Sequence, residues 1–457
     1  MFRQRRCCIY VKDSLMEKRL NWKSRIGFIL AGAGAAIGLG AIWKFPFMAG
    51  SNGGAAFLFP YVVMSLTVGL ALLLAEVTLG RMGRGSVVTT FRCIGGKGWS
   101  VWGYLGVLTG FCVLSFYSAI GGWTIAYLVD ALLSPEFLSD KTQLAQHFGA
   151  FVSSPVACIA SQTSFIVLTA VAVAFGINKG IERMGKILMP LLLVMVLAII
   201  IWSLTLPNSE GGLKYLFSWN PSAFNFQSLL MAMGFTFFSL CVGCGCMMTY
   251  GSYLGKTEDL PASCASIVFL TTLSSILGGL LVMPAVFAFG LDPASGPNLT
   301  FITMPYVFAQ FSFGQVLAVA FFLCLLFAAI TSAVSLLELV VAFLVDELKF
   351  GRRSACLVST VALIAVGSLC GLSFGPLADF KIFNRTIFDT FDYFTSNLSL
   401  PIGGLVVCAL AGYKVWPAFT EELASGATLK PMTLKLLRFF ILIVSPALVL
   451  TVLVTGL

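Results

Sequence analysis

The feature that most constrains this chain is a series of long apolar runs, each about as long as a bilayer is thick. A helix that crosses the hydrocarbon core needs about 18 or more mainly apolar residues. With 58% hydrophobic and only 10% charged residues, the chain is predicted to be an all-α polytopic membrane protein in contact with lipid. We predict eleven spans, at residues 24–47, 55–80, 100–133, 159–177, 185–206, 225–254, 261–291, 314–345, 354–373, 385–413 and 434–456.

The lysine and arginine residues indicate how these spans are oriented. Most of the 28 lie before the first span or in every second connection after it, for example at residues 81–97 and 414–438. Positive residues concentrate on the cytoplasmic side of membrane proteins. We therefore predict a multi-pass protein with its N-terminus inside and its C-terminus outside. The net charge of +9 then reflects topology, and we expect no nucleic-acid partner.

Two of the spans contain residues that interrupt helices. Residues 31–47, AGAGAAIGLGAIWKFPF, include glycines, a lysine and a proline, and Gly243 and Gly245 interrupt residues 235–250, FTFFSLCVGCGCMMTY. Glycine and proline destabilise a helix interior. Unwinding frees backbone carbonyls to bind a cation, and the half-helix ends carry partial charges that suit a zwitterion. The glycines taken alone could equally form a small-residue seam for close helix packing.

The interrupted spans lie five spans apart. This spacing is typical of two five-helix halves of inverted topology, with the binding site at mid-membrane where the unwound first and sixth helices meet. We therefore predict four segments, namely a cytoplasmic N-terminal segment at 1–23, a first five-helix repeat at 24–206, a second, inverted repeat at 225–413 and an additional helix at 434–456.

Sequence motifs along nearly the whole chain match one transporter family. They include WKSRIGFILAGAGAAIGLGAIWKFPF, NGGAAFLFPY, EVTLGR, FYSAIGGW, FAAITSAVSLLE and FDYFTSNLSLPIGG. On these motifs the sequence resembles the neurotransmitter:sodium symporters, specifically their bacterial amino-acid transporters with the leucine-transporter fold. The family-like sequence starts near Met16, which is therefore an alternative start, and residues 1–15 lack the apolar core of a signal peptide.

The resemblance implies a sodium-coupled secondary active symporter of the bacterial cytoplasmic membrane. It would import a neutral, large apolar or aromatic amino acid by alternating access; an amino-acid-binding sensor without net transport is the alternative. We do not expect an enzyme, because the hydrolase-like pattern GLSFG at 371–375 ends a span without its strand–turn–helix context. The 13 cysteines show no metal-ligand spacing and are expected to be buried free thiols. The oligomeric state is left open.

The resemblance also implies the ion sites. A single sodium ion is expected at the family's second site, because the first site loses its asparagine at Ala41 and its seventh-span ligand near Leu270 or Thr271. Dependence on chloride is not expected, because Tyr61 and Ser274 match the family's chloride site but Phe235 replaces its glutamine. The sodium ligands implied are the carbonyls of Gly34, Ile37 and Ala328 and the hydroxyls of Thr331 and Ser332.

The same resemblance assigns the substrate pocket. Tyr117, with the amides of Leu39 and Gly40, would hold the substrate carboxylate, and Gly38 replaces the aspartate that meets the amine in monoamine transporters. Cys244 replaces an aromatic residue and leaves room for a large side chain. Any single pocket residue could also serve only helix packing. The remaining pocket residues implied are Ala36, Val113, Phe238, Ser239, Cys241, Ser332 and Leu336.

Charged residues supply the implied gates. Lys44 and Asp392 form the outer pair, above an aromatic lid of Tyr117 and Phe238. The inner network is implied to comprise Arg19, Trp22, Tyr253 and Asp346.

Two carboxyls lie inside apolar spans, where an isolated charge is costly enough to suggest function. Glu76 is implied to support the unwound helices by hydrogen bonding. Glu338 is either a proton-coupling carboxyl or a protonated structural residue.

Overall fold

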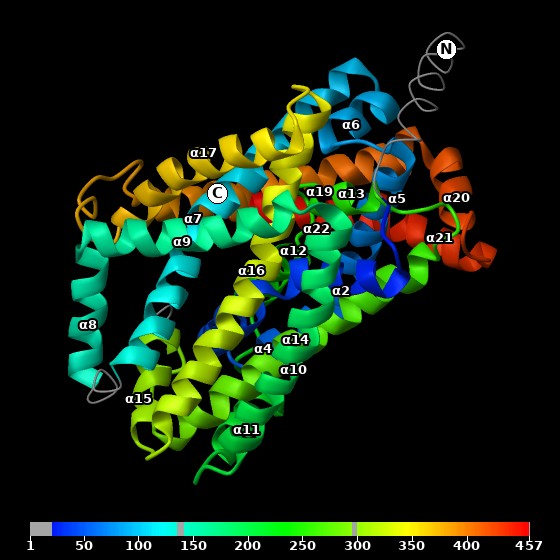
Figure 1. Cartoon of the computed structure of the whole chain (residues 1–457). Coiled ribbons are helices and arrows are strands. Elements are labelled where there is room, and N and C mark those ends of the chain that lie inside the picture. Colours follow the sequence, from blue (N-terminus) through cyan, green and yellow to red (C-terminus); the bar gives the residue numbers. More distant parts are fainter. Residues whose placement is uncertain (1–20, 135–140, 295–298, 457) are drawn as a thin grey trace.

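The computed structural model describes residues 21–134, 141–294 and 299–456, and α-helices account for most of them (Figure 1). Ten helices in these ranges are long and apolar enough to cross a membrane. They are Arg25–Ser51, Ala55–Gly83, Lys97–Leu133, Pro155–Ala174, Ile177–Leu204, Leu260–Ala288, Gly314–Asp346, Arg352–Leu372, Ile387–Lys414 and Pro431–Thr455.

The predicted sixth span is present but broken. It consists of α12 (Phe226–Ser239) and the short α13 (Cys246–Gly251), with non-helical chain between them. The all-α polytopic fold predicted from the apolar runs is therefore confirmed. The division into two inverted repeats stays a prediction.

Several of the spanning helices are composite, because a π-helical turn joins two α-helical parts. Such turns are frequent at functional sites. The helices joined by a π-helical turn are α2 (Arg25–Leu39) and α3 (Phe45–Ser51) through Gly40–Lys44, α4 (Ala55–Met64) and α5 (Leu70–Gly83) through Ser65–Gly69, α18 (Ile387–Tyr393) and α19 (Leu400–Cys408) through Phe394–Ser399, and α21 (Pro431–Phe439) and α22 (Ser445–Gly456) through Phe440–Val444. A π-helical segment, Ile177–Glu182, also precedes α10 (Arg183–Leu204). The remaining spanning helices are α7 (Ser100–Leu133), α9 (Pro155–Ala174), α14 (Leu260–Ala288), α16 (Gly314–Asp346) and α17 (Arg352–Leu372).

Short helices connect the spans at the two ends of the bundle. In Figure 1, α6 (Val87–Gly95) and α20 (Trp416–Ala424) lie near the start of the first span, whereas α8 (Lys141–Ser153), α11 (Glu210–Phe217) and α15 (Met304–Ala309) lie at the opposite end. The basic connections expected inside and the connections expected outside therefore separate in space.

Polar side chains set where several spans begin. The Ser24 hydroxyl accepts from the Gly27 amide at the start of α2, and the Asp259 carboxylate accepts from the Ala262 amide at the start of α14. At α12 the Asn225 side chain accepts from the backbone N–H of Ser228, whose hydroxyl accepts in return from the Asn225 N–H. Such caps satisfy amide groups that a helix leaves unpaired at its N-terminus.

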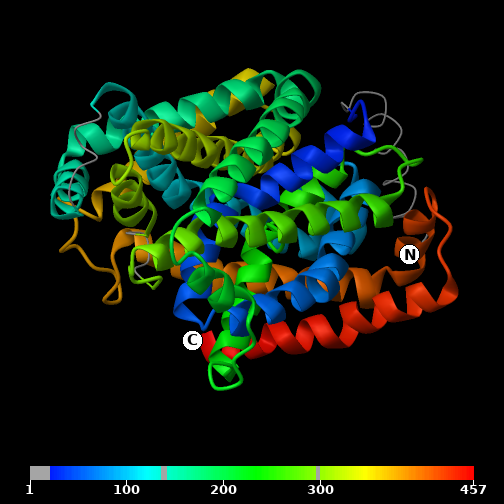
Figure 2. The ribbon, with the colours of Figure 1, turned by 90° about the horizontal axis from the view of Figure 1, so that it is seen from below.

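The helices that carry the predicted site lie in the middle of the bundle. Helix α16 packs along both α7 and α2, and the implied sodium and substrate positions on these helices are buried. The last span, by contrast, lies along one flank, as the red rod at the lower edge of Figure 2. Only 17% of its apolar window is buried, so most of its surface is left for lipid or another chain.

Candidate functional site

The first span is broken at Gly38. Its φ of 32° and ψ of −167° are non-helical, and helical backbone angles resume at Leu39. A Cβ atom at this position would lie 2.3 Å from Ser332 Oγ and 3.1 Å from Tyr117 Oη. Both the backbone conformation and the lack of space therefore require glycine here.

The break in the sixth span is held by a carboxylate from the second. Left-handed φ angles occur at Cys241 (53°), Gly243 (96°) and Gly245 (88°). The Gly243 amide donates to Glu76 Oε1 at 2.5 Å, and Glu76 is only 1% exposed. Its other oxygen, Oε2, has no hydrogen-bond partner among the described residues.

The implied sodium ligands lie where α2 meets α16. Ser332 Oγ donates to the carbonyl oxygens of Gly34 at 3.1 Å and Ala35 at 2.6 Å, and Thr331 Oγ1 donates to the Ala328 carbonyl at 2.9 Å. The helices approach so closely because Gly34 has no side chain: a Cβ there would lie 3.1 Å from Thr331 Cβ. Neutral carbonyl and hydroxyl oxygens of this kind suit a hard cation.

The Ile37 carbonyl belongs to the same part of α2. It accepts a hydrogen bond from the Gly40 amide, just beyond the break. This bond leaves one lone pair of the Ile37 oxygen for an ion. Of the five implied ligands, Gly34, Thr331 and Ser332 thus lie at the contact between α2 and α16. Ile37 lies beside the break.

The implied first sodium site offers few oxygens in the structure. Helix α14 approaches so closely that a Cβ on Gly278 would lie 2.0 Å from the Ala41 carbonyl oxygen. Thr271 Oγ1 donates to the Ile267 carbonyl in its own helix at 2.8 Å. Ser239 Oγ likewise donates to the Thr236 carbonyl at 3.2 Å.

The region that resembles a chloride site differs in register from the sequence match. Tyr61 Oη lies 2.9 Å from Ser275 Oγ and 3.4 Å from Ser239 Oγ. The hydroxyl facing Tyr61 is thus that of Ser275, and the choice of Ser274 was wrong because one residue along a helix turns the side chain by about 100°. The Phe235 ring packs on Tyr61, with the ring centroids 5.0 Å apart.

The implied substrate pocket surrounds the break in α2. Tyr117 Oη accepts from the Leu39 amide at 3.0 Å. Phe238 packs on Gly40, where a Cβ would lie 3.1 Å from Phe238 Cε1. The other implied pocket residues are buried, apart from the partly buried Cys241, and are Ala36, Val113, Ser239, Cys244, Ser332 and Leu336.

Lys44 connects the outer pair to the aromatic lid. Its Nζ lies 3.7 Å from Asp392 Oδ1 and 4.1 Å from the centroid of the Phe238 ring. Asp392 Oδ1 also accepts from Ser396 Oγ at 2.8 Å. One lysine therefore makes both an ion pair and a cation–π contact above the substrate pocket.

The implied inner network is partly described. Arg19 lies outside the described residues. Trp22 donates from Nε1 to the Tyr250 carbonyl at 3.0 Å and from its amide to the Tyr253 carbonyl at 3.1 Å. Asp346 Oδ2 accepts from the Ser86 amide at 2.5 Å. The N-terminal end of the first span is thus attached to the sixth span.

Glu338 has a cationic partner that the sequence reasoning did not identify. Its Oε2 lies 2.5 Å from Arg352 Nη2, and its Oε1 accepts from Arg352 Nη1 at 3.1 Å and from Tyr253 Oη at 2.7 Å. Glu338 is fully buried. Glu338 is therefore not an isolated charge, and the choice between a proton-coupling role and a structural role stays a prediction. The signal that could have identified Arg352 is its position at the start of a span, beside a buried acid.

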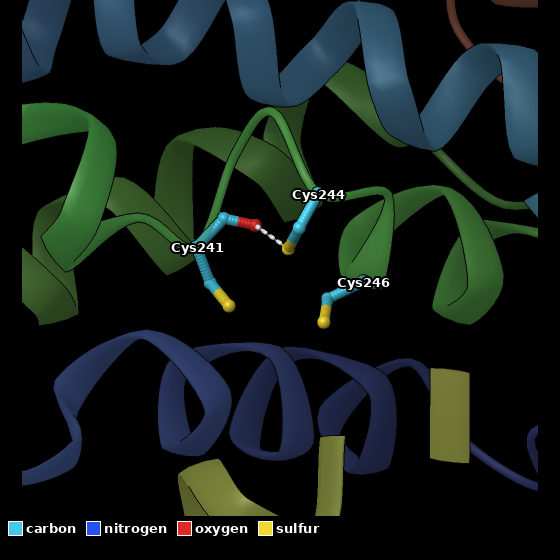
Figure 3. A group of neighbouring side chains, drawn as sticks. All are labelled: Cys241, Cys244 and Cys246. Carbon is cyan, nitrogen blue, oxygen red and sulfur yellow. Dashed lines mark hydrogen bonds between the residues drawn. The ribbon is translucent and has the colours of Figure 1, made fainter. Parts of the chain in front are cut away.

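Three cysteines of the broken sixth span also come together. The sulfur atoms of Cys241, Cys244 and Cys246 all lie within 4.8 Å of one another (Figure 3). Their spacing in the sequence gave no indication of this, because it is the non-helical backbone between α12 and α13 that brings them together.

Comparison with known proteins identifies the family. The model of the sodium:neurotransmitter symporter family matches residues 19–139 and 152–457. The chain belongs to this family.

Individual relatives agree with the assignment to this family. An uncharacterized sodium-dependent transporter of Bacillus subtilis, YhdH, is 38% identical over 87% of this chain and 89% of its own length. The bovine sodium-dependent dopamine transporter is 25% identical over 91% of this chain and 66% of its own length. The crystal structure of MhsT in complex with L-phenylalanine is 37% identical, with a TM-score of 0.90 over 96% of this chain and 100% of that one.

The family is one of membrane transporters, and the expectation that the chain is not an enzyme is confirmed. The serine of the GLSFG pattern has a structural role instead. Ser373 Oγ donates to the Cys370 carbonyl at 2.7 Å and accepts from the Phe388 amide at 3.3 Å. It therefore joins the end of α17 to the start of α18.

Proposed function

We propose that this chain is a sodium-coupled symporter that imports a neutral, large apolar or aromatic amino acid across the bacterial cytoplasmic membrane. Its N-terminus would lie inside and its C-terminus outside. The observation that carries the proposal is the position of Ser332, which donates to carbonyls of α2 and lies directly beside the break at Gly38. An ion bound at this hydroxyl would therefore act on the substrate pocket.

The polar groups at the break suit the backbone end of an amino acid. The Tyr117 hydroxyl and the Leu39 amide, now bonded to each other at 3.0 Å, can both donate to a carboxylate. Gly38 leaves no room for the aspartate that an amine without its own carboxylate would need. These features favour amino acids over biogenic amines.

The size of the side chain pocket supports a large substrate. Cys244 places a small thiol where the resembled leucine transporter has an aromatic ring, so the pocket gains volume. The structure of MhsT was determined with L-phenylalanine, and its chain is 37% identical to this one. An aromatic or large apolar side chain, such as that of phenylalanine or methionine, therefore fits best.

We propose that transport is coupled to one sodium ion. The second site has its carbonyls and hydroxyls close together, whereas the first site retains only the Ala36 carbonyl and the Ser239 hydroxyl. Two neutral oxygens leave a desolvated cation undercoordinated. Without the charge of a first sodium ion, there is also no reason to expect dependence on chloride.

The proposed cycle uses the contacts described above. Sodium at Gly34, Thr331 and Ser332 would hold α2 against α16 and order the pocket. Closure of Phe238 beneath Lys44 and Asp392 would seal the outside. Release of the N-terminal attachment through Trp22 would then open the inside, as alternating access requires.

The test is uptake of labelled amino acids into proteoliposomes against sodium concentration. We expect accumulation of phenylalanine or another large neutral amino acid, with a Hill coefficient near one for sodium. Tyr117→Phe should weaken substrate affinity, whereas Tyr104→Phe, which alters an exposed tyrosine of the same helix, should not. Binding without accumulation or counterflow would favour the amino-acid sensor and contradict transport.

A further inference from the structure

The three thiols of the broken sixth span form a compact cluster inside the protein. Cys244 and Cys246 are 1% and 0% exposed, and Cys241 is partly buried. In Figure 3 the three side chains lie next to one another, and all three sulfur atoms lie within 4.8 Å of one another. None of the three is in a disulfide.

The broken backbone is what allows this arrangement. On a regular helix, residues 241 and 246 would point about 140° apart. The left-handed φ angles at Cys241, Gly243 and Gly245 turn the chain so that the three side chains converge. The cluster is therefore a property of the break in the sixth span and would be absent from the same sequence in a straight helix.

The existing contacts of the thiols are weak. Cys244 Sγ donates to the Cys241 carbonyl at 3.6 Å, and Cys246 Sγ donates to the Ser335 carbonyl of α16 at 3.7 Å. Thiols are poor hydrogen-bond donors, so little is lost when these protons leave. A ligand that bonds to these sulfur atoms would therefore displace only weak hydrogen bonds.

We propose that Cys241, Cys244 and Cys246 bind one soft divalent metal ion, of the class of Zn²⁺ or Cd²⁺. Zinc–sulfur bonds are about 2.3 Å long, so two thiolates on one tetrahedral ion lie about 3.8 Å apart. The cluster needs to contract by no more than about 1 Å to reach that distance. Three thiols would release three protons to water and leave a complex with one net negative charge.

The charge of the complex selects the class of metal. A monovalent soft ion on three thiolates would leave two uncompensated negative charges in the membrane interior, where charge is costly. A divalent ion leaves only one. Sodium does not compete for this site, because a hard ion prefers oxygen to sulfur.

A small pocket borders the cluster at Cys244. Cys244, Gly243 and Gly245 line this pocket together with Phe91, Trp102 and Met248. Bound metal would connect Cys241, two residues after the end of α12, to Cys246 at the start of α13. It would thus hold the two halves of the sixth span in a fixed relation and inhibit transport.

The experiment is a cadmium titration of the purified full chain in detergent, followed by the ultraviolet thiolate-to-cadmium charge-transfer absorption. Cys7 and Cys8 form an adjacent pair that could also bind metal, so the parent protein carries Cys7→Ser and Cys8→Ser. We expect one cadmium ion per chain, released by a chelator. This readout requires neither sodium nor amino acid, so it stands even where the proposed transport function fails.

Single variants identify the ligands. Cys241→Ala, Cys244→Ala and Cys246→Ala should each weaken binding by at least about tenfold and reduce the absorption. Cys264→Ala, which removes a buried thiol of α14, should leave both unchanged. Circular dichroism and size-exclusion profiles check that each variant is folded. Failure of the folded parent to bind cadmium, or binding that any one of the three variants leaves intact, would overturn the proposal.

Discussion

Ser332 Oγ lies 3.1 Å from the Gly34 carbonyl oxygen, across the contact between α16 and α2. The same hydroxyl is the atom nearest to a Cβ built at Gly38. The implied ion site and the implied substrate pocket therefore share one side chain.

Ser332→Ala should weaken sodium dependence while preserving the fold. The variant loses a ligand to a cation, an interaction worth about 1.5–3 kcal/mol, so the half-saturating sodium concentration should rise at least about tenfold. Ser335→Ala is the matched control, because its hydroxyl donates only to a carbonyl of its own helix, that of Ser332, at 2.8 Å. Uptake measured against sodium concentration checks this, and an equal effect of both variants would remove Ser332 from the ion site.

Gly38→Ala should abolish uptake and lower thermal stability. A non-glycine residue in this sparsely populated φ/ψ region costs about 1–3 kcal/mol, and the methyl group would also collide with Ser332 Oγ. Gly234→Ala, in a regular part of α12 with nothing within 4 Å of the added atom, should change stability by less than about 1 kcal/mol. Thermal unfolding in detergent and substrate binding measure the two effects. Normal binding by Gly38→Ala would show that the break is not needed.

Glu338→Gln should destabilise the protein without changing how uptake depends on pH. The substitution leaves Arg352 paired with a neutral amide, and breaking a buried ion pair costs up to about 3–5 kcal/mol, less here because Arg352 is 25% exposed. Arg353→Gln, at the exposed neighbouring position, serves as the control. A lower melting temperature with an unchanged pH profile supports a structural pair. Loss of proton-driven uptake with an unchanged melting temperature would instead support the proton-coupling role.

Lys44→Met should slow uptake roughly two- to tenfold, because both the ion pair with Asp392 and the cation–π contact with Phe238 are lost. The half-saturating sodium concentration should stay the same, since Lys44 is not among the implied sodium ligands. Lys214→Met removes a lysine that is 74% exposed and should have no effect. Initial uptake rates distinguish these outcomes, and an unchanged rate for Lys44→Met would exclude a gating role.

Ala41→Asn should leave the Hill coefficient for sodium near one. An amide at position 41 supplies only one of the two missing ligands, and Thr271 Oγ1 still donates to the Ile267 carbonyl of its own helix. The double variant Ala41→Asn with Thr271→Asn is the stricter comparison, because Thr271 lies one turn before Ser275 on the same face of α14 and the variant restores both positions. A coefficient well above one in the single variant would contradict the proposed cause of the single-ion stoichiometry.

The spans and the two breaks could be predicted because each rests on many residues acting alike. Apolar residues repeated over a bilayer's thickness leave little choice of structure, and glycines inside them mark interruptions. The sequence could not tell that Gly38, among its neighbouring glycines, carries the non-helical conformation. That choice depends on Ser332 and Tyr117, which lie far away along the chain.

The errors and omissions at the site have a common physical origin. Ser275 rather than Ser274 faces Tyr61, and the partner of Glu338, Arg352, was not identified. Both depend on helix rotation and packing, which a motif match does not specify. The convergence of the three cysteines depends likewise on left-handed backbone conformations that no spacing rule anticipates.

The attachment of Gly243 has a mechanical consequence. Its amide is bonded to Glu76, and a Cβ there would lie 2.2 Å from the Leu400 carbonyl oxygen, so this point is clamped from two sides. It can thus act as a fulcrum for α12, which has 14 residues and is about 21 Å long. A turn of about 10° there would swing the far end of the lever by roughly 4 Å.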